Sequence, residues 1–174
     1  MPSPQETLVI KDSSVVIDLV NAGLFQVWFA LGIRTMTTDF VESELRNGAQ
    51  WAEVAPLIAE GLLTVESFGT AEVLQLVQLS KEHKISNPDG SVLYLSQQKS
   101  AILLTGDRKL RKACTALGIE CRGTLWVIDR LLTANVIACP RATAALRLLI
   151  SNGARLPEDE VVSRLKLWAP DGNA

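Results

Sequence analysis

Carboxylates are the side chains in this sequence whose type and position best suit chemistry. Asp18 directly follows the apolar run 15–17, and Asp107 closes the apolar segment 101–106. In open α/β sheets, ligands bind outside the carboxyl ends of the strands. If these two runs are neighbouring parallel strands, both acids lie at the same edge of the sheet and can belong to one site.

A third acid, Asp89, is expected to reach this edge from a helix. Asn87 is a good N-cap residue and Pro88 suits the first helical position, so Asp89 falls in the first turn. Each acid also has a simpler explanation when taken singly. Asp18 and Asp107 can be N-caps, and Asp89 can complement a helix dipole.

The fourth candidate acid lies in segment 38–45. Asp39 and Glu42 have the spacing of a capping box, which gives Glu42 a structural role. Glu44 has no such role and follows Phe40 and Val41 by helical spacing, so we expect it on the inward face. A carboxylate turned inward is costly without a partner, and a bound cation would remove that cost.

Taken together, the acids favour a site for hard divalent cations. Several clustered carboxylates repel one another and become protonated unless cations hold them. One or two Mg²⁺ or Mn²⁺ ions at such a site can activate water and stabilise a phosphate leaving group. Polar and basic residues next to the predicted edge are candidates for phosphate contact, although a solvated helix face also explains the basic run: Asn21, Thr105, Arg108, Lys109, Arg111 and Lys112.

Composition excludes several other classes of protein. The 174 residues are 48% hydrophobic, which excludes a disordered chain, and no run approaches the roughly 20 apolar residues of a membrane span. The single histidine, His83, excludes a His-rich zinc site within one chain. The N-terminal residues lack the pattern of a signal peptide, and three cysteines without a C-x-x-C pair suit a reducing compartment, so we expect a cytoplasmic protein.

Apolar runs of strand length alternate with longer periodic segments, which predicts an α/β fold with a mainly parallel sheet. The expected strands are 14–17, 33–37, 62–66, 101–105 and 119–121. The expected helices are 21–31, 39–58 with a break near Pro56, 70–79, 88–99, 108–117 and 125–132. Residues 1–135 are assigned to this domain, and residues 136–174 to a C-terminal helical appendage packed on it.

In the order of these motifs, residues 14–132 resemble the PIN-domain family of nucleases, which includes the ribonuclease toxins of bacterial toxin–antitoxin pairs. The motifs are a strand ending in Asp18 with Asn21 three residues on, Val41-x-x-Glu44-Leu45, the helix start at 88–93, and segment 104–108 around Asp107. Segment 113–127 is similar to the closing segment of the family. No single motif is decisive, but their order is specific.

The resemblance implies a three-layer α/β/α sandwich and Mg²⁺- or Mn²⁺-dependent cleavage of RNA. It implies Asp18, Glu44, Asp89 and Asp107 as catalytic, metal-binding acids, with Thr105 as a polar helper. It also implies a homodimer and a small antitoxin partner. The lack of an apolar run of membrane-spanning length predicts that no membrane is involved. Two alternatives remain: a catalytically inactive PIN-like module that binds RNA or protein, and a Mg²⁺-dependent phosphatase or receiver fold.

Overall fold

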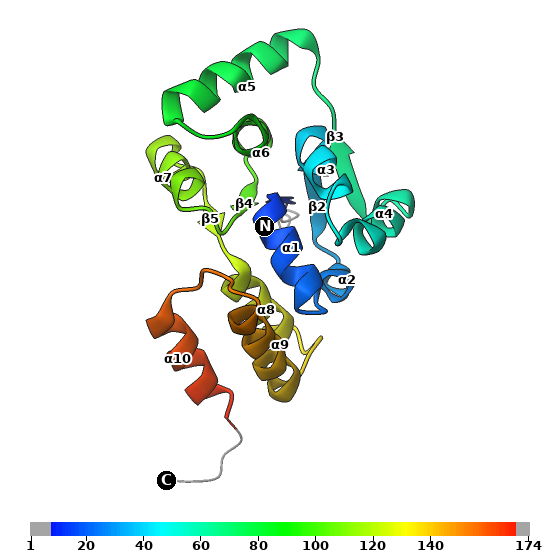
Figure 1. The fold of residues 1–174 in the computed structure, drawn as a ribbon, viewed down its shortest axis with the longest axis vertical. Helices are drawn as coiled ribbons and strands as arrows, with labels where there is room; N and C mark the ends of the chain where they lie inside the picture. The colour runs from blue at the N-terminus through cyan, green and yellow to red at the C-terminus, as the bar shows by residue number, and fades with distance from the viewer. Residues whose placement is uncertain (1–7, 170–174) are drawn as a thin grey trace, which may run out of the picture.

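The computed structural model describes residues 8–169, which form a three-layer α/β/α sandwich around one parallel sheet (Figure 1). The sheet order is β3-β2-β1-β4-β5, and every neighbouring pair is parallel. This confirms the predicted fold class. The strands are β1 Leu8–Lys11, β2 Arg34–Thr38, β3 Leu63–Glu66, β4 Ile102–Leu104 and β5 Cys121–Arg122.

Helices connect the strands and extend beyond the last one. Those of the α/β body are α1 Ser13–Asn21, α2 Phe25–Trp28, the 3₁₀ turn Phe29–Leu31, α3 Asp39–Arg46, α4 Trp51–Ala59, α5 Thr70–His83, α6 Asn87–Lys99, α7 Arg108–Leu117 and α8 Thr124–Thr133. Two more, α9 Cys139–Ser151 and α10 Glu158–Leu167, follow. In Figure 1, α5 lies outside α6 at one end of the molecule, and α8, α9 and α10 gather at the other.

The prediction of a strand over 14–17 is wrong, because these residues belong to helix α1. The central strand is β1, which precedes them and pairs with both β2 and β4. Asp12 caps α1 by accepting the backbone N–H of Ser13 at 2.7 Å. The buried residues Val15, Val16, Leu19 and Val20 recur at helical spacing, which outweighs the β-branched character of the run.

Two predicted helix boundaries also differ from the structure. Segment 39–58 does break, but at residues 47–50 between α3 and α4, and Pro56 lies inside α4. Segment 21–31 is not one helix, because it contains the end of α1, α2 and a 3₁₀ turn.

No single helix in the range 8–169 is long and apolar enough to cross a membrane. Helix α1 and residues 25–31, which are bent by 110° relative to each other, together have the length and composition of a span.

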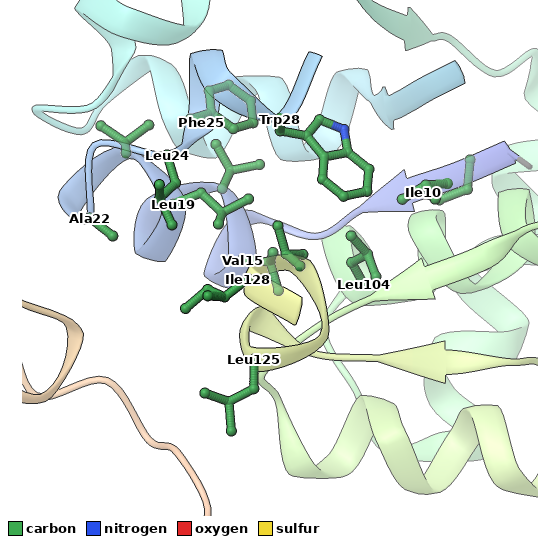
Figure 2. Packing of buried hydrophobic residues seen from close by; sticks show 14 of the residues in the cluster. Ile10, Val15, Leu19, Ala22, Leu24, Phe25, Trp28, Leu104, Leu125 and Ile128 are labelled. Carbon is green, nitrogen blue, oxygen red and sulfur yellow. The ribbon is translucent and has the colours of Figure 1, made fainter. Parts of the chain in front are cut away.

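The hydrophobic core joins the centre of the sheet to α1 and α8. Ile10 and Leu104 come from the neighbouring strands β1 and β4, and Figure 2 shows them near Val15 of α1 and Ile128 of α8. All four side chains are fully buried. Because β1 lies at the centre of this packing, the residue that follows it is held in a fixed position at the sheet edge.

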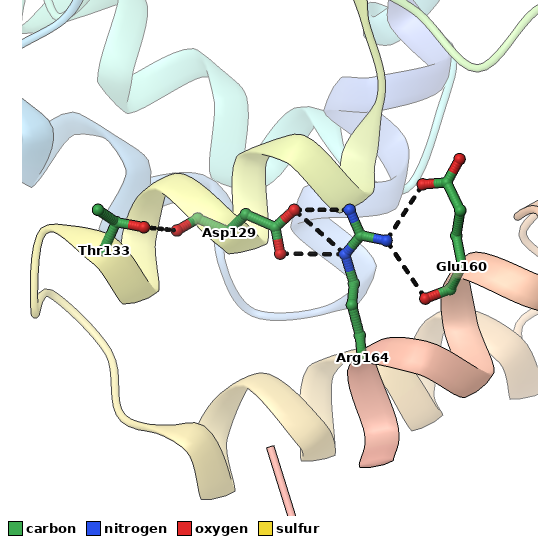
Figure 3. Close-up of polar contacts among 4 residues, drawn as sticks. All are labelled: Asp129, Thr133, Glu160 and Arg164. Atoms are coloured by element: carbon green, nitrogen blue, oxygen red, sulfur yellow. Dashed lines mark hydrogen bonds and ion pairs between the residues drawn. The ribbon is translucent and has the colours of Figure 1, made fainter. Parts of the chain in front are cut away.

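The C-terminal helices share this core. Leu146 and Leu149 of α9 are fully buried in the same cluster, and α10 adds Val161. Figure 3 shows Arg164 of α10 between two acids. Its guanidinium donates to both carboxylate oxygens of Asp129 on α8, with Nη2 to Oδ2 at 2.6 Å, and also to Glu160. The appendage is therefore fastened by both apolar packing and a bidentate ion pair.

Candidate active site

The centre of the candidate site is Asp12, which immediately follows β1. Its Oδ2 accepts the hydroxyl of Thr105 at 2.7 Å, and the same hydroxyl oxygen accepts the backbone N–H of Asp107 at 3.0 Å. Thr105 follows β4, the parallel neighbour of β1. Two neighbouring strands therefore deliver Asp12 and Asp107 to the carboxyl edge of the sheet, where ligands bind in open α/β folds.

Short polar groups hold Asp12 in place. The hydroxyl of Ser14 donates to Oδ2 of Asp12 at 2.7 Å, and Ser14 Oγ accepts the backbone N–H of Gly106 at 3.0 Å. Asp107 has its own structural role, since its Oδ1 accepts the N–H groups of Lys109 and Leu110 at the start of α7. Its capping explanation is thus correct, and it is compatible with a place in the site.

Glu44 and Asp89 bring two more carboxylates to this edge from α3 and α6. Partial desolvation raises the pKa of the Glu44 carboxylate although the residue as a whole is exposed, a hydrogen bond with Ser13 lowers it, and the charges of Asp12 and Asp89 raise it further. Burial likewise raises the pKa of Asp89, against hydrogen bonds to Ser86, and the charges of Asp12 and Asp107 add to the increase. Asp12, Glu44, Asp89 and Asp107, here called the acidic site, therefore act on one another electrostatically.

The helical settings of these two acids differ from the predicted ones. Ser86, rather than Asn87, caps α6, and Asp89 completes a capping box by accepting the N–H of Ser86. Glu44 is exposed and lies at the edge of a pocket, so its predicted position on the inward face is wrong. On α3 the inward positions are Val41 and Leu45.

Asp18 and Asn21 lie outside the acidic site. Asp18 is in the middle of α1, where its Oδ2 accepts the hydroxyl of Thr124 at 2.8 Å and ties α1 to α8. Asn21 ends α1 and accepts from Gln50 at 3.1 Å. Their predicted place just beyond a strand is wrong, because the strand that was assigned before Asp18 is a helix.

The predicted basic residues all lie on α7, directly after Asp107. Arg108, Lys109 and Lys112 are exposed and recur at a spacing that places them on one side of the helix. Arg111 is also exposed, but its Nε donates to the carbonyl of Thr105 at 3.2 Å. Three cations therefore face solvent beside the acidic site, and the fourth helps to hold the loop after β4.

Asp12 is the residue that the sequence interpretation missed. The short apolar run 8–10 is followed by the charged Lys11, and a charged residue is not expected in a buried central strand. The signal was nonetheless present, because Asp12 is a good N-cap and apolar residues at 15, 16, 19 and 20 follow it with helical spacing.

The donor set of the acidic site suits a hard divalent cation. All four groups are carboxylates, and oxygen is the ligand that Mg²⁺ prefers. The carboxylates repel one another, and a bound cation would relieve that repulsion. Within residues 8–169, the side chains in their present positions form no group of three or more Asp, Glu, His or Cys that could hold a metal ion. Coordination would therefore require these side chains to close in on the ion.

Comparison with known proteins places this chain in a family. A family model described as a PIN domain matches residues 8–170, so the chain belongs to the PIN-domain family, whose members are generally nucleases. The crystal structure of PAE2754 from Pyrobaculum aerophilum is similar with a TM-score of 0.51 and 12% identity, over 71% of this chain and 96% of that chain. That likeness concerns the fold alone. The search of curated proteins found no match.

Proposed function

We propose that this protein is a Mg²⁺- or Mn²⁺-dependent endoribonuclease whose catalytic acids are Asp12, Glu44, Asp89 and Asp107. The observation that carries the proposal is the convergence of these four carboxylates at the carboxyl edge of the parallel sheet. Asp12 takes the place that the sequence interpretation gave to Asp18. The PIN-domain family supports nuclease chemistry in general.

The chain's own residues have distinct jobs in this proposal. Thr105 and Ser14 fix the Asp12 carboxylate, so that one oxygen-donor group is preorganised before substrate arrives. The exposed cations Arg108, Lys109 and Lys112 attract the phosphate backbone of RNA toward the acids. A bound divalent ion supplies charge neutralisation and activation of water.

Cleavage of a labelled single-stranded RNA with Mn²⁺ tests the proposal. Asp12→Asn and Asp107→Asn should each lower the cleavage rate by about 100-fold or more. Asp18→Asn is the matched control, because it changes an aspartate of the same helix region outside the acidic site, and it should keep cleavage near the wild-type rate. Loss of activity in Asp18→Asn with full activity in Asp12→Asn would overturn the assignment.

Metal binding separates this proposal from an inactive PIN-like module. Calorimetric titration with Mn²⁺ should show binding in wild-type protein and loss of binding in Asp89→Asn. An inactive RNA- or protein-binding module would show neither Mn²⁺ binding at the acids nor Mn²⁺-dependent cleavage.

The finer biological role is also part of the proposal. We propose a cytoplasmic, homodimeric toxin that is held by a small antitoxin, as the PIN-type toxins suggest. Pull-down with the product of an adjacent small reading frame, followed by an RNA cleavage assay of the complex, tests the antitoxin. Cleavage by the complex at the full rate of the free protein would contradict it.

A further inference from the structure

Two of the three free cysteines lie together where helix α7 packs beside strand β5 (Figure 1). Cys114 is on α7 and fully buried, whereas Cys121 begins β5 and is partly exposed. A hydrogen bond joins their thiol groups. We propose that this pair is a thiol–disulfide site, in which hydrogen peroxide oxidises Cys121 and Cys114 then closes a disulfide with it. The site does not depend on the proposed ribonuclease function, because none of its chemistry involves the acids.

The turn after α7 brings the two cysteines together. Gly118 ends α7 in the left-handed conformation, with a φ of 67°, and the N–H of Ile119 donates to the carbonyl of Cys114 at 2.9 Å. The chain then enters β5, where Cys121 is paired with Leu103 of β4. These backbone bonds hold the two cysteines next to each other before any reaction, so the second thiol is already in place when the first is oxidised.

The surroundings of the two thiols make Cys121 the more reactive one. The hydrogen bond from Cys114 lowers the pKa of Cys121, and this effect outweighs that of burial, which raises it. The positive charges of Arg111 and Arg122 lower that pKa further, and the weaker effect of the Asp12 charge raises it. For Cys114, the hydrogen bond and burial both raise the pKa. Because the thiolate is the nucleophilic form of cysteine, Cys121 should react first.

One of the two arginines is held in position beside this pair. Nε of Arg111 donates to the carbonyl of Thr105 at 3.2 Å. Its guanidinium occupies space that a side chain at residue 123 would need, since a Cβ added to Gly123 would lie 2.6 Å from Nη2. Arg122 instead pairs with Glu120 at 3.0 Å on the exposed part of β5. A fixed positive charge near Cys121 favours its thiolate without further ordering of side chains.

The proposed oxidation takes place in two balanced steps. The Cys121 thiolate attacks one oxygen of hydrogen peroxide, so that a sulfur–oxygen bond forms, the oxygen–oxygen bond breaks and the other oxygen leaves as water after protonation. The product is a sulfenic acid on Cys121. The sulfur of Cys114 then attacks this sulfur, the disulfide bond forms, and the hydroxyl leaves as water with the proton of Cys114. Two electrons pass from the thiols to the peroxide, and a thiol reductant reverses the reaction.

A disulfide at this site would join the two elements on either side of the turn after β4. The backbone N–H of Thr105 donates to the carbonyl of Arg122 in β5 at 3.0 Å, and Asp107 caps the start of α7. A covalent link between α7 and β5 limits the local opening of this unit, because the two elements can no longer separate. We therefore expect slower amide hydrogen exchange in α7 of the oxidised protein.

Peptide mapping of the full-length protein after treatment with hydrogen peroxide tests the site. The wild type should form an intramolecular disulfide between Cys114 and Cys121, and dithiothreitol should reverse it. Cys114→Ser should stop at a sulfenic acid on Cys121, which dimedone labels. Cys139→Ser is the matched control, because it removes the exposed cysteine of α9 and should leave disulfide formation at the wild-type rate.

Hydrogen exchange gives a second readout. Peroxide should slow amide exchange in α7 of the wild type by about threefold or more, because the link limits local opening. The same treatment should leave this exchange unchanged in Cys121→Ser, which cannot form the link. Oxidation of Cys139 alone, with Cys114 and Cys121 recovered as thiols, would overturn the inference. Accumulation of a sulfenic acid on Cys121 of the wild type without disulfide closure would overturn it as well. Both decisive outcomes are read in the wild type, so the test does not depend on the folding of a serine variant.

Discussion

The residue directly before the central acid is a lysine buried in the core. Lys11 is fully buried, and its Nζ lies 4.0 Å from the centroid of the Trp28 ring and 5.5 Å from that of Phe25. No hydrogen-bond partner for Nζ is present among residues 8–169. Burial lowers the pKa of Lys11 well below its usual value of 10.5, so the fold favours the neutral amine.

Lys11→Met should stabilise the protein in a pH-dependent way. Between the lowered folded pKa and 10.5 the unfolded chain binds a proton that the native state lacks, so the stability of the wild type rises with pH. The gain should be largest at low pH and shrink as the pH approaches 10.5, while about 1–3 kcal/mol, the usual cost of an unpaired buried polar group, should remain above that pH. Urea unfolding at several pH values measures it, with the exposed Lys81→Met as control. A gain that does not depend on pH would contradict the explanation.

Glu44 has the opposite charge and the opposite pH dependence. Its pKa is raised by partial desolvation and by the charges of Asp12 and Asp89, so at pH 7 the ionised carboxylate opposes folding. As pH falls through the raised pKa, the native state takes up a proton that the unfolded chain lacks, and this cost disappears. Glu44→Gln should therefore raise the melting temperature at pH 7 but not at pH 4.

Two further measurements make this prediction specific to the site. The exposed Glu53→Gln on α4 should show no such gain, since it lies outside the acidic site. Glu44→Gln should also weaken Mn²⁺ binding, because it removes a proposed ligand. A variant that lowers stability at pH 7 would show that Glu44 is not under electrostatic strain.

Residue types alone predicted Glu44, Asp89 and Asp107 as candidates, and the structure brings these three together. Asp107 was found because it follows a predicted strand, and Asp89 because it lies in the first turn of a predicted helix. Glu44 was selected for an inward position on its helix that the structure does not show. Asp12 was missed because strand identity depends on pairing with distant segments. Val15 and Val16 favour a strand locally, and the helix is indicated only by their spacing with Leu19 and Val20 after the N-cap Asp12.

At the scale of elements, the position of Asp89 depends on close packing between α5 and α6. Gly90 follows Asp89, and a Cβ at this position would lie 1.8 Å from Oγ of Ser80 and 3.1 Å from the carbonyl oxygen of Leu76. Ser80 already donates to that carbonyl at 2.7 Å. A side chain at Gly90 would therefore push α6, and Asp89 with it, away from α5.

Gly90→Ala should lower the free energy of unfolding by about 1–3 kcal/mol, the typical cost of overpacking. It should also reduce Mn²⁺-dependent cleavage, because the start of α6 carries an acid of the proposed site. Adding Ser80→Ala removes the closest clash and should restore part of the stability. Gly69→Ala is the control, since its Cβ would make only an ordinary contact at 3.7 Å with Glu72. Equal stability of Gly90→Ala and wild type would contradict the packing argument.

At the scale of the whole molecule, charge is distributed unevenly. The formal net charge is −2, which by itself argues against a nucleic-acid partner. Four of the 19 acids form the acidic site. If bound cations neutralise these four, the net charge of the rest of the chain is +2. The exposed cations of α7 follow directly after Asp107, so the local charge, rather than the total charge, is what the proposed RNA backbone would meet.

The C-terminal helices join the body partly through an ion pair between α8 and α10. Asp129 on α8 and Arg164 on α10 are partly exposed, and a bidentate pair of this kind contributes about 1 kcal/mol, the upper end for surface ion pairs. A double-mutant cycle with Asp129→Asn and Arg164→Gln should give a coupling energy of that size. Hydrogen exchange of Arg164→Gln should show faster exchange in α10 and unchanged exchange in α1, because apolar packing keeps α9 on the core. The exposed Lys166→Gln is the control on the same helix. If exchange rises equally in α1 and α10, the appendage unfolds only with the whole domain, and the division between residues 1–135 and 136–174 has no energetic counterpart.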